Sequence, residues 1–301
     1  MEHGELRGLR YVLIAAMVSG FAIFANKFFV GVYSDAFVYT TAKNILAATF
    51  LAALLAFTND MQQLRKLKRK DWLKLSSIGV VGGSIPFLLF FKGLTLTSAA
   101  SGAFIHKTMF VWVAALSTFF LRERLKLHHI TAALLLLAGN LLAIGLNAFT
   151  VNTGDLMILA ATLFWACETI ISKNALKDIK PSVVASARMA FGSVVLLGFL
   201  GATGRIGSLT ALTAPQAVAA LTTSAILFAY VTSWYNGLKL VSASTATVVL
   251  LLGAPVTTLL SATFLSAAVP TVQTAGILMV LAGTVAYVRL SPGGTEHATF
   301  A

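Results

Sequence analysis

The sequence predicts an all-α polytopic membrane protein whose ten transmembrane helices form two inverted repeats of five. Three observations lead to this prediction: the composition, a stretch that occurs twice, and the distribution of Lys and Arg among the loops. Of the 301 residues, 58% are hydrophobic and 11% are charged, whereas a soluble domain carries about 25% charged residues. So few charges do not cover a water-facing surface of this size, and we therefore expect the chain to lie in a lipid bilayer.

The stretch from Gly93 to Gly139 occurs a second time from Gly237 to Gly283, shifted by 144 residues (237 − 93) without a gap. Both copies open with Gly-Leu-x-Leu-x-Ser-Ala and close with Leu-Ala-Gly. A repeat inside a hydrophobic chain indicates a duplicated membrane bundle with its site between the repeats. We assign residues 1–148 to the first repeat, 149–290 to the second and 291–301 to a disordered tail, with both repeats in one membrane domain.

A helix that crosses about 30 Å of hydrocarbon needs about 20 apolar residues, and ten runs are long enough. Pro181, Pro215 and Pro270 each stand where a run begins, a position that tolerates the missing N–H. The runs are Arg10–Val30, Ser34–Phe57, Trp72–Phe91, Thr97–Phe120, Leu127–Leu146, Asp155–Ala175, Pro181–Gly201, Pro215–Leu238, Ser242–Leu265 and Pro270–Leu290.

The basic residues gather on the side of the bundle that carries both termini. The opposite side has only Lys92 and Arg205. The positive-inside rule makes the first side, and therefore both termini, cytoplasmic. The basic residues of the first side are Arg7, Arg10, Arg65, Lys66, Lys68, Arg69, Lys70, Lys74, Arg122, Arg124, Lys126, Lys173, Lys177, Lys180, Lys239 and Arg289.

The charges also indicate that the two repeats face opposite ways. RKLKRK, between the second and third runs, corresponds to GATGRIGSLTA between the seventh and eighth. RERLK after the fourth run corresponds to SAAVP after the ninth. Because basic residues are missing where the second copy would face outward, the repeat is predicted to have inverted topology.

Composition and motifs also exclude several classes of function. The formal net charge of +12 lies mostly in short loops, where it reports membrane orientation and not nucleic-acid binding. The single cysteine, Cys167, excludes an internal disulfide and a CxxC metal site. No GxxxxGK[ST], HExxH or GxSxG motif occurs. We therefore predict no cofactor, no metal and no enzymatic activity; the partners are a small-molecule substrate and the bilayer, and a monomer is compatible with the sequence.

The sequence resembles the EamA branch of the drug/metabolite transporter superfamily along nearly its whole length. The resemblance rests on the Gly-Leu-x-x-x-Ser-Ala entry to the fourth and ninth runs, Pro255, the FFLRERL segment with Glu123, the spacing from Trp165 to Lys173, and the basic residues Lys43 and Arg188. Ser19, Val111 and Ala267 stand where the family pattern has Trp, Pro and Glu. Among the members, the resemblance favours exporters of the YddG type, which move amino acids.

Ionisable residues at bilayer depth cost about 2.5–3.5 kcal/mol on insertion scales, so they usually face a cavity or a partner. Five such candidates are Lys43, Lys107, His106, Glu168 and Arg188. In one interpretation the cations bind a substrate carboxylate, and Glu168 pairs with Arg188 or receives a substrate ammonium. In the other, Glu168 and Arg188 form a structural ion pair and Lys43 snorkels. Lys27, close to the outer end, is expected to snorkel into water.

Aromatic residues beside these charges form a second signal. Tyr39 lies one helical turn from Lys43, and Trp165 lies three residues before Glu168, so each pair shares a helix face. We include Tyr39 and Trp165 in the candidate substrate site, where they would stack on an apolar substrate group. Ordinary helix packing is the alternative explanation for any single ring.

Helix-breaking residues mark candidate moving parts. Gly79 and Gly83 permit close approach of a neighbouring helix. Pro86 and Pro255 free a backbone carbonyl and bend their helices. We consider these four residues hinge candidates; a static kink is the equally open alternative.

These observations predict a secondary transporter that works by alternating access around a central cavity in a bacterial inner (plasma) membrane. The resemblance implies export of small metabolites and favours amino acids, with aromatic or hydrophobic ones included. A nucleotide-sugar, drug or lipid carrier of the same superfamily is the alternative. An intramembrane enzyme, the alternative from another class, lacks a nucleophile or metal motif. Both proton coupling and facilitated diffusion fit the residues.

Overall fold

The computed structural model describes residues 3–123, 127–144, 151–266 and 268–290, and every regular element in these ranges is helical. The predicted polar tail, the basic residues Arg124 and Lys126, and Ala267 lie outside the described residues. The elements are α1 (His3–Gly31), α2 (Ala36–Phe57), α3 (Met61–Leu64), α4 (Arg69–Gly83), α5 (Ile85–Leu96), α6 (Ala99–Lys107), α7 (Met109–Phe120), α8 (Leu127–Ile144), α9 (Thr153–Ala175), α10 (Pro181–Ala202), η2 (Ile206–Leu209), α11 (Ala214–Leu240), α12 (Ala243–Leu250), α13 (Gly253–Leu265) and α14 (Thr271–Leu290).

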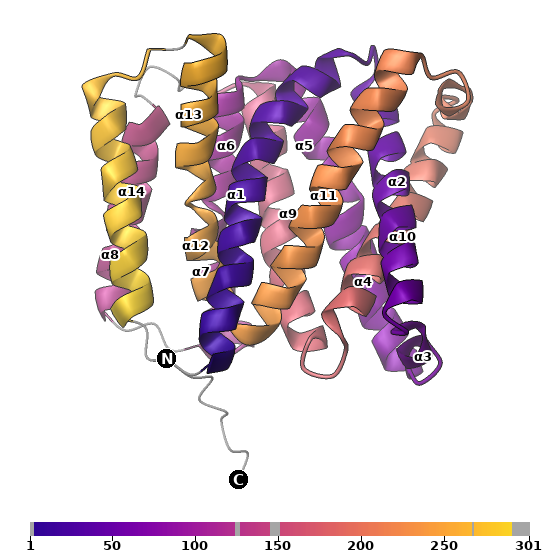
Figure 1. Ribbon diagram of the computed structural model, residues 1–301, viewed down its shortest axis with the longest axis horizontal. Coiled ribbons are helices and arrows are strands. Elements are labelled where there is room, and N and C mark those ends of the chain that lie inside the picture. Colours follow the sequence, from indigo (N-terminus) through magenta and orange to yellow (C-terminus); the bar gives the residue numbers. More distant parts are fainter. Residues whose placement is uncertain (1–2, 124–126, 145–150, 267, 291–301) are drawn as a thin grey trace.

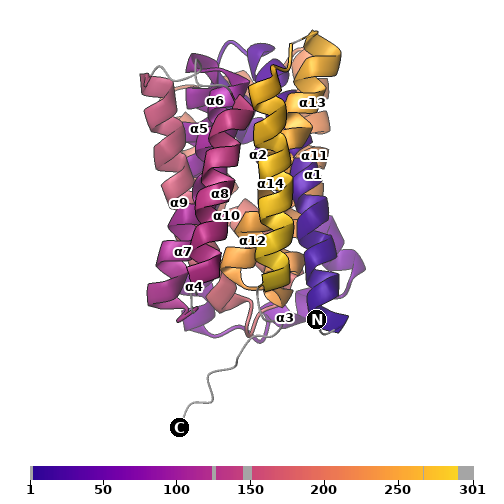
Figure 2. The ribbon, with the colours of Figure 1, turned by 90° about the vertical axis from the view of Figure 1, so that its left-hand side faces the viewer.

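The long helices run side by side as one bundle (Figures 1 and 2). In the described part of the chain, nine spans are long and apolar enough to cross a membrane, and α8 contains a shorter apolar helix, His129–Ala143. Nine of the ten predicted runs coincide with these spans, and the run at 127–146 coincides with the shorter helix. The helices therefore follow the apolar runs of the sequence.

Three of the predicted runs are broken near the middle, two of them beside the prolines that were expected to bend their helices. The third breaks at Ser84 (φ −134°, ψ −75°), the fourth at Thr108 and the ninth after Leu250. Pro86 and Pro255 follow two of these breaks and lack the N–H of a continuous helix. Thr108 and Leu252 are related by the 144-residue shift, so the two copies of the repeated stretch are interrupted at matching places.

The two copies also begin in the same way. Ser98 caps α6 by accepting a hydrogen bond from the Ser101 amide at 3.0 Å, and Ser242 caps α12 by accepting one from the Thr245 amide at 3.0 Å. A serine Oγ at this position pairs one of the free N–H groups of the first turn. The repeated Ser-Ala motif is therefore the start signal of both helices.

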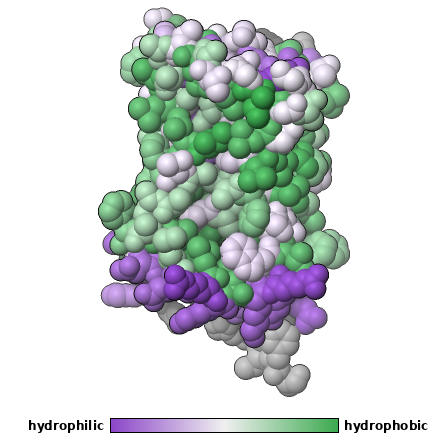
Figure 3. Space-filling model, turned by 90° about the vertical axis from the view of Figure 1, so that its right-hand side faces the viewer, coloured by the Kyte–Doolittle hydropathy of each residue, from purple (hydrophilic) through white to green (hydrophobic). Residues whose placement is uncertain are grey.

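One end of the bundle is strongly hydrophilic (Figure 3). It is the end at which α1 begins and α14 ends (Figure 1). Its basic residues include five exposed side chains around α3 and the start of α4: Arg65, Lys66, Lys68, Arg69 and Lys70. The space-filling view shows a mainly hydrophobic surface along the helices beyond this band, as a lipid-facing surface requires.

At the same end, Asp60 connects the loop after α2 to the start of α10. Its carboxylate accepts hydrogen bonds from Lys180 Nζ at 2.6 Å and from Ser182 Oγ at 2.5 Å. Partial burial by itself would raise the pKa of Asp60, but these hydrogen bonds outweigh it and hold the pKa below its ordinary value.

Helix α4 packs on α10 with almost no side chain between the backbones. A Cβ on Gly83 would lie 2.2 Å from the Arg188 carbonyl oxygen, one on Gly192 would lie 2.3 Å from the Gly83 carbonyl oxygen, and one on Gly79 would lie 2.3 Å from Phe191 Cβ. Only glycine allows this approach. The contact carries Arg188, which precedes Gly192 by one turn on α10, into the centre of the bundle.

Candidate functional site

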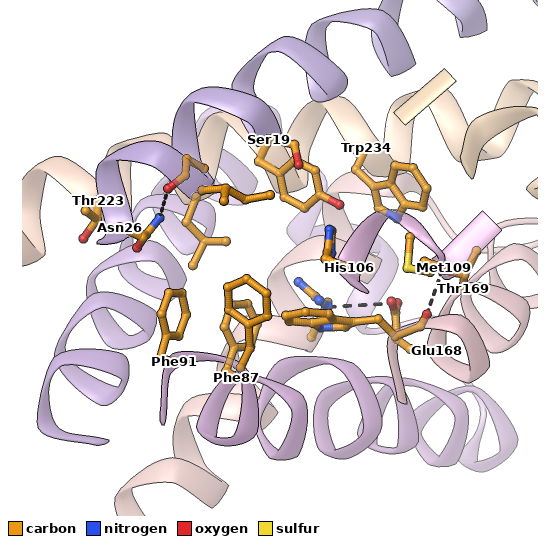
Figure 4. A pocket seen from close by; sticks show the side chains of 17 residues that line it. Ser19, Asn26, Phe87, Phe91, His106, Met109, Glu168, Thr169, Thr223 and Trp234 are labelled. Carbon is orange, nitrogen blue, oxygen red and sulfur yellow. Dashed lines mark hydrogen bonds and ion pairs between the residues drawn. The ribbon is translucent and has the colours of Figure 1, made fainter. Parts of the chain in front are cut away.

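A cavity lies at the centre of the bundle, lined by residues from α1, α5, α6, α7, α9, α10 and α11. Its volume, counted as the space open to the centre of a water-sized sphere, is about 90 Å³. Both halves of the chain contribute to its walls. Figure 4 shows Asn26 and Phe91 toward one end of the cavity and Glu168 and Thr169 toward the other.

The charged end is formed by Glu168 of α9 and Arg188 of α10. Arg188 Nε lies 4.0 Å from Glu168 Oε1, and the two side chains are 6% and 3% exposed. Oε1 also accepts hydrogen bonds from Tyr235 at 2.5 Å and from Ser172. Because a buried carboxylate needs such partners, these hydroxyls hold Glu168 in its place.

Arg188 keeps unused hydrogen-bonding capacity. A guanidinium has five N–H donors, yet Nε has no hydrogen-bond partner among the described residues, and Nη1 has a contact with Met189 Sδ at 3.8 Å. The ring of Phe87 lies 5.4 Å from Arg188 Cζ. A cation at the cavity wall with free donors matches the bidentate geometry of a carboxylate or a phosphate.

Aromatic rings form the middle of the cavity. The centroid of the Trp165 ring lies 5.5 Å from that of Phe87, 5.3 Å from that of Phe90 and 5.1 Å from that of His106. Trp165 Nε1 donates to the Gly82 carbonyl at 3.0 Å. This carbonyl is the one that Pro86, four residues later, leaves without an α-helical partner. The proline break therefore supplies the acceptor that fixes Trp165.

The other polar end consists of Asn26 with two buried residues behind it. Asn26 Oδ1 accepts a hydrogen bond from Lys43 Nζ at 3.1 Å and another from the Tyr39 hydroxyl. Lys43 Nζ also lies 3.5 Å from the centroid of the Phe91 ring, within the range of a cation–π interaction. Lys43 is 2% exposed, so it does not snorkel outward as the alternative interpretation expected.

The seven predicted substrate-binding residues are all buried but differ in their access to the cavity. Arg188, Glu168, His106 and Trp165 line it. Lys43 and Tyr39 reach its wall through Asn26, and Lys107 does so through a 3.0 Å hydrogen bond from its Nζ to Ser19 Oγ. Of the three predicted cations, Arg188 is therefore the one in the lining.

Several residues that were not predicted complete the site. Asn26, Tyr230 and Trp234 line the cavity, and Tyr235 binds Glu168. These side chains are uncharged, so the cost of burying charge at bilayer depth does not point to them. The spacing of Ser19 and Asn26, seven residues apart in an apolar run, would have placed both on one helix face.

Beyond the cavity, two lysines cap the carbonyl ends of α5 and α11 in the same way. Lys27, which is partly exposed, donates from Nζ to the carbonyls of Leu94 at 2.8 Å and Thr97 at 2.7 Å. Lys173 Nζ donates to the carbonyls of Leu238 at 2.7 Å and Val241 at 2.6 Å, and these acceptors are related to the first pair by the 144-residue shift. A positive charge at a helix C-terminus is stabilising.

Replacing Lys173 by methionine is expected to lower the free energy of unfolding by about 1.5–3 kcal/mol, because the last carbonyls of α11 lose a charged donor. Thermal unfolding of the purified protein measures this change. Lys177→Met is the matched control because Lys177 is exposed two residues beyond α9. Equal melting temperatures for the two variants would show that the cap contributes nothing.

Glu123 joins the end of α7 to the start of α12. Its Oε1 accepts from the Ala243 amide at 2.8 Å, and its Oε2 accepts from the Ser244 amide at 3.2 Å and from Ser244 Oγ at 2.6 Å. Carboxylates are favourable at a helix N-terminus. The RERL segment of the first repeat therefore fastens a helix of the second.

Comparison with known proteins places this architecture in a family. The family model of the EamA-like transporter family matches the chain twice, over residues 6–145 and 152–289. One solved crystal structure of a protein covers 97% of this chain and 99% of its own length, with a TM-score of 0.74 and 16% sequence identity. At that identity the likeness concerns the fold alone.

Curated relatives include the uncharacterized transporter YyaM of Bacillus subtilis, 27% identical over 63% of this chain and 65% of its own length. An uncharacterized transporter of Haemophilus influenzae is 30% identical over 59% of each chain. One of Archaeoglobus fulgidus is 27% identical over 75% of this chain and 80% of its own. The match thus spans less than two thirds of the first two relatives. Since the family model matches both halves, the chain belongs to the EamA-like transporter family.

Proposed function

We propose that the protein is a secondary transporter that exports amino acids and similar small metabolites by alternating access around the central cavity. One observation carries the proposal: Arg188, whose Nε is ion-paired with Glu168 but has no hydrogen-bond partner among the described residues, lies at the wall of a cavity that is otherwise mostly aromatic and apolar. Apolar pockets with a few placed polar groups are typical of small-molecule sites.

The arrangement suits a zwitterion with an apolar side chain. The guanidinium of Arg188 would bind the substrate carboxylate. The hydrogen bonds to Glu168 from described residues both end on Oε1, so Oε2 would receive the substrate ammonium. The substrate side chain would then lie against Phe87, Phe90 and Trp165, which favours aromatic and hydrophobic amino acids.

The size of the cavity favours a small substrate over a nucleotide sugar. The volume of about 90 Å³ is well below the roughly 300–1,000 Å³ that is typical of pockets for drug-sized ligands. An amino acid fits this space, whereas a nucleotide sugar, a drug or a lipid would need a wider cavity. These carriers are the alternative within the superfamily.

For the membrane arrangement we propose ten helices in two inverted repeats of five, at residues 1–148 and 149–290, with both termini in the cytoplasm of a bacterial cell. The support is the exposed basic residues at the end of the bundle where α1 begins and α14 ends (Figures 1 and 3). The breaks before Pro86 and Pro255 would serve as hinges, while Gly79 and Gly83 would keep α4 and α10 moving together.

Flux measurements in proteoliposomes test the proposed function. We expect the wild-type protein to transport labelled phenylalanine and leucine but not phenylalaninamide, which keeps the ring and the ammonium group but lacks the carboxylate. Imposing a pH gradient across the same vesicles separates proton coupling from facilitated diffusion. Equal flux of phenylalanine and its amide, or flux of a nucleotide sugar alone, would contradict the proposal.

A further inference from the structure

A second cavity lies between α6 and α13 on one side and α8 and α14 on the other, where the α8–α14 pair stands beside the rest of the bundle (Figures 1 and 2). Its volume is about 150 Å³ on the measure that gives about 90 Å³ for the central cavity. Among the described residues, none lines both cavities. The second cavity is therefore a separate compartment.

Asn140 of α8 gives this cavity its chemical character. Its side chain lines the cavity and is 0% exposed, and neither Nδ2 nor Oδ1 has a hydrogen-bond partner among the described residues. Leaving a buried donor or acceptor unpaired costs about 1–3 kcal/mol. An amide in this position is costly for the fold by itself, so it calls for a partner from outside the chain.

The close packing of α8 against α14 holds Asn140 in place. A Cβ on Gly139 would lie 2.8 Å from Met279 Cβ, and one on Gly276 would lie 2.3 Å from the Ala143 amide nitrogen. With the backbones this close, α8 has little freedom to turn about its axis. The amide therefore stays at the cavity wall.

The remaining polar groups of the wall define the charge of the ligand. These groups are the neutral amide of Gln273 and three hydroxyls. The hydroxyls of Thr257, Thr258 and Ser261 donate to the carbonyls of Gly20 at 2.9 Å, Ala254 at 3.2 Å and Thr257 at 2.9 Å. No Asp, Glu, Lys, Arg or His is among the described residues that line the cavity. A charged ligand would have no counter-ion here, so the ligand must be neutral.

We propose that this cavity is a second binding site, which takes a neutral molecule with a primary amide or hydroxyl group on a short apolar body. The amide of Asn140 offers one donor group and one acceptor side by side, which such a group matches with two hydrogen bonds. Single waters need only about 10–15 Å³ each on this measure, so one water does not fill it.

The second cavity is also linked by a hydrogen bond to α1, which lines the central cavity. Thr257, in its wall, donates to the carbonyl of Gly20 on α1, and the neighbouring Ser19 lines the central cavity. A ligand that fills the second site braces α13 against the α8–α14 pair. Such a ligand has two possible sources. It is either a small amide or alcohol from the cytoplasm or periplasm, or a neutral lipid with free hydroxyls from the membrane.

Binding of butanamide and 1-butanol to the full-length protein in detergent tests the proposal, with butanoate as the charged control. In saturation-transfer NMR titrations we expect the first two to bind and butanoate not to bind. Asn140→Leu should weaken butanamide binding at least about tenfold, because both hydrogen bonds are lost. Without ligand this variant should melt at a higher temperature than the wild type, because a buried unpaired amide is removed.

Asn44→Leu is the matched control, since Asn44 is equally buried on α2 and lines neither cavity; it should bind butanamide as the wild type does. Native mass spectrometry separates the two sources. If a neutral lipid copurifies with the wild type, is displaced by butanamide and is missing from Asn140→Leu, the ligand comes from the membrane. If butanamide binds and no such lipid copurifies, the ligand is a solute. The proposal is overturned if the wild type binds no probe, if Asn140→Leu binds butanamide normally, or if that variant melts at a lower temperature than the wild type.

Discussion

Replacing Arg188 by glutamine is expected to lower the flux of phenylalanine at subsaturating concentration about 100-fold. Removing one partner of a buried charge pair costs about 2–5 kcal/mol, and 2.7 kcal/mol corresponds to about 100-fold in affinity. Glutamine keeps two N–H donors but loses the charge that a carboxylate needs. The loss should appear as a raised KM in proteoliposome flux assays.

The controls separate loss of binding from loss of folding. Arg205→Gln removes an arginine that is paired with Asp35 at 3.2 Å and is 39% exposed, and it should transport as the wild type does. The double variant Glu168→Gln with Arg188→Gln removes both charges, so no carboxylate is left buried without its cation. If this double variant folds and transports at the wild-type rate, the role given to Arg188 is wrong.

Replacing Gly192 by leucine is expected to lower the free energy of unfolding by about 3 kcal/mol or more. Its Cβ would lie 2.3 Å from the Gly83 carbonyl oxygen and 2.8 Å from Gly83 Cα, both of them backbone atoms. Overpacking usually costs about 1–3 kcal/mol, and a clash with backbone should reach or exceed the top of this range. The stability of a folded protein is only about 5–15 kcal/mol.

The amount of monodisperse protein that remains after heating in detergent, measured by size-exclusion chromatography, checks this prediction. Gly198→Leu is the matched control on α10, because no atom lies within 4 Å of a Cβ added at Gly198. We expect this variant to behave as the wild type does. Similar heat resistance of the two leucine variants would show that the α4–α10 contact is not tight.

The membrane helices could be predicted almost completely from the sequence, because each apolar run is long enough by itself to require a helix. The breaks within these helices were harder to predict. Pro86 and Pro255 indicated two of the breaks, but the break at Thr108 has no proline and became evident only in the structure. The hydrogen bonds from Lys27 to the carbonyls of Leu94 and Thr97 were also not predicted, because these carbonyls belong to another helix.

In the candidate site, the cost of burying charge was enough to select Glu168 and Arg188, which the structure brings within 4.0 Å of each other. The same criterion selected Lys43, which the structure places behind Asn26 and not in the lining. The criterion did not select Tyr235, because a phenol carries no charge, although the Tyr235 hydroxyl donates a hydrogen bond to Glu168.

The membrane class, the duplicated stretch and the set of ionisable residues at bilayer depth could be inferred from composition and spacing, which act locally along the chain, and the family from a resemblance of motifs. The folded structure was needed to show which of these residues share a cavity, that Trp165 bonds the carbonyl freed by Pro86, and that Asn140 lines a second cavity. The reason is physical: helical periodicity fixes the face on which a side chain lies, whereas the helix opposite that face depends on close backbone contacts, such as that of Gly83 with Gly192, between residues far apart in the chain.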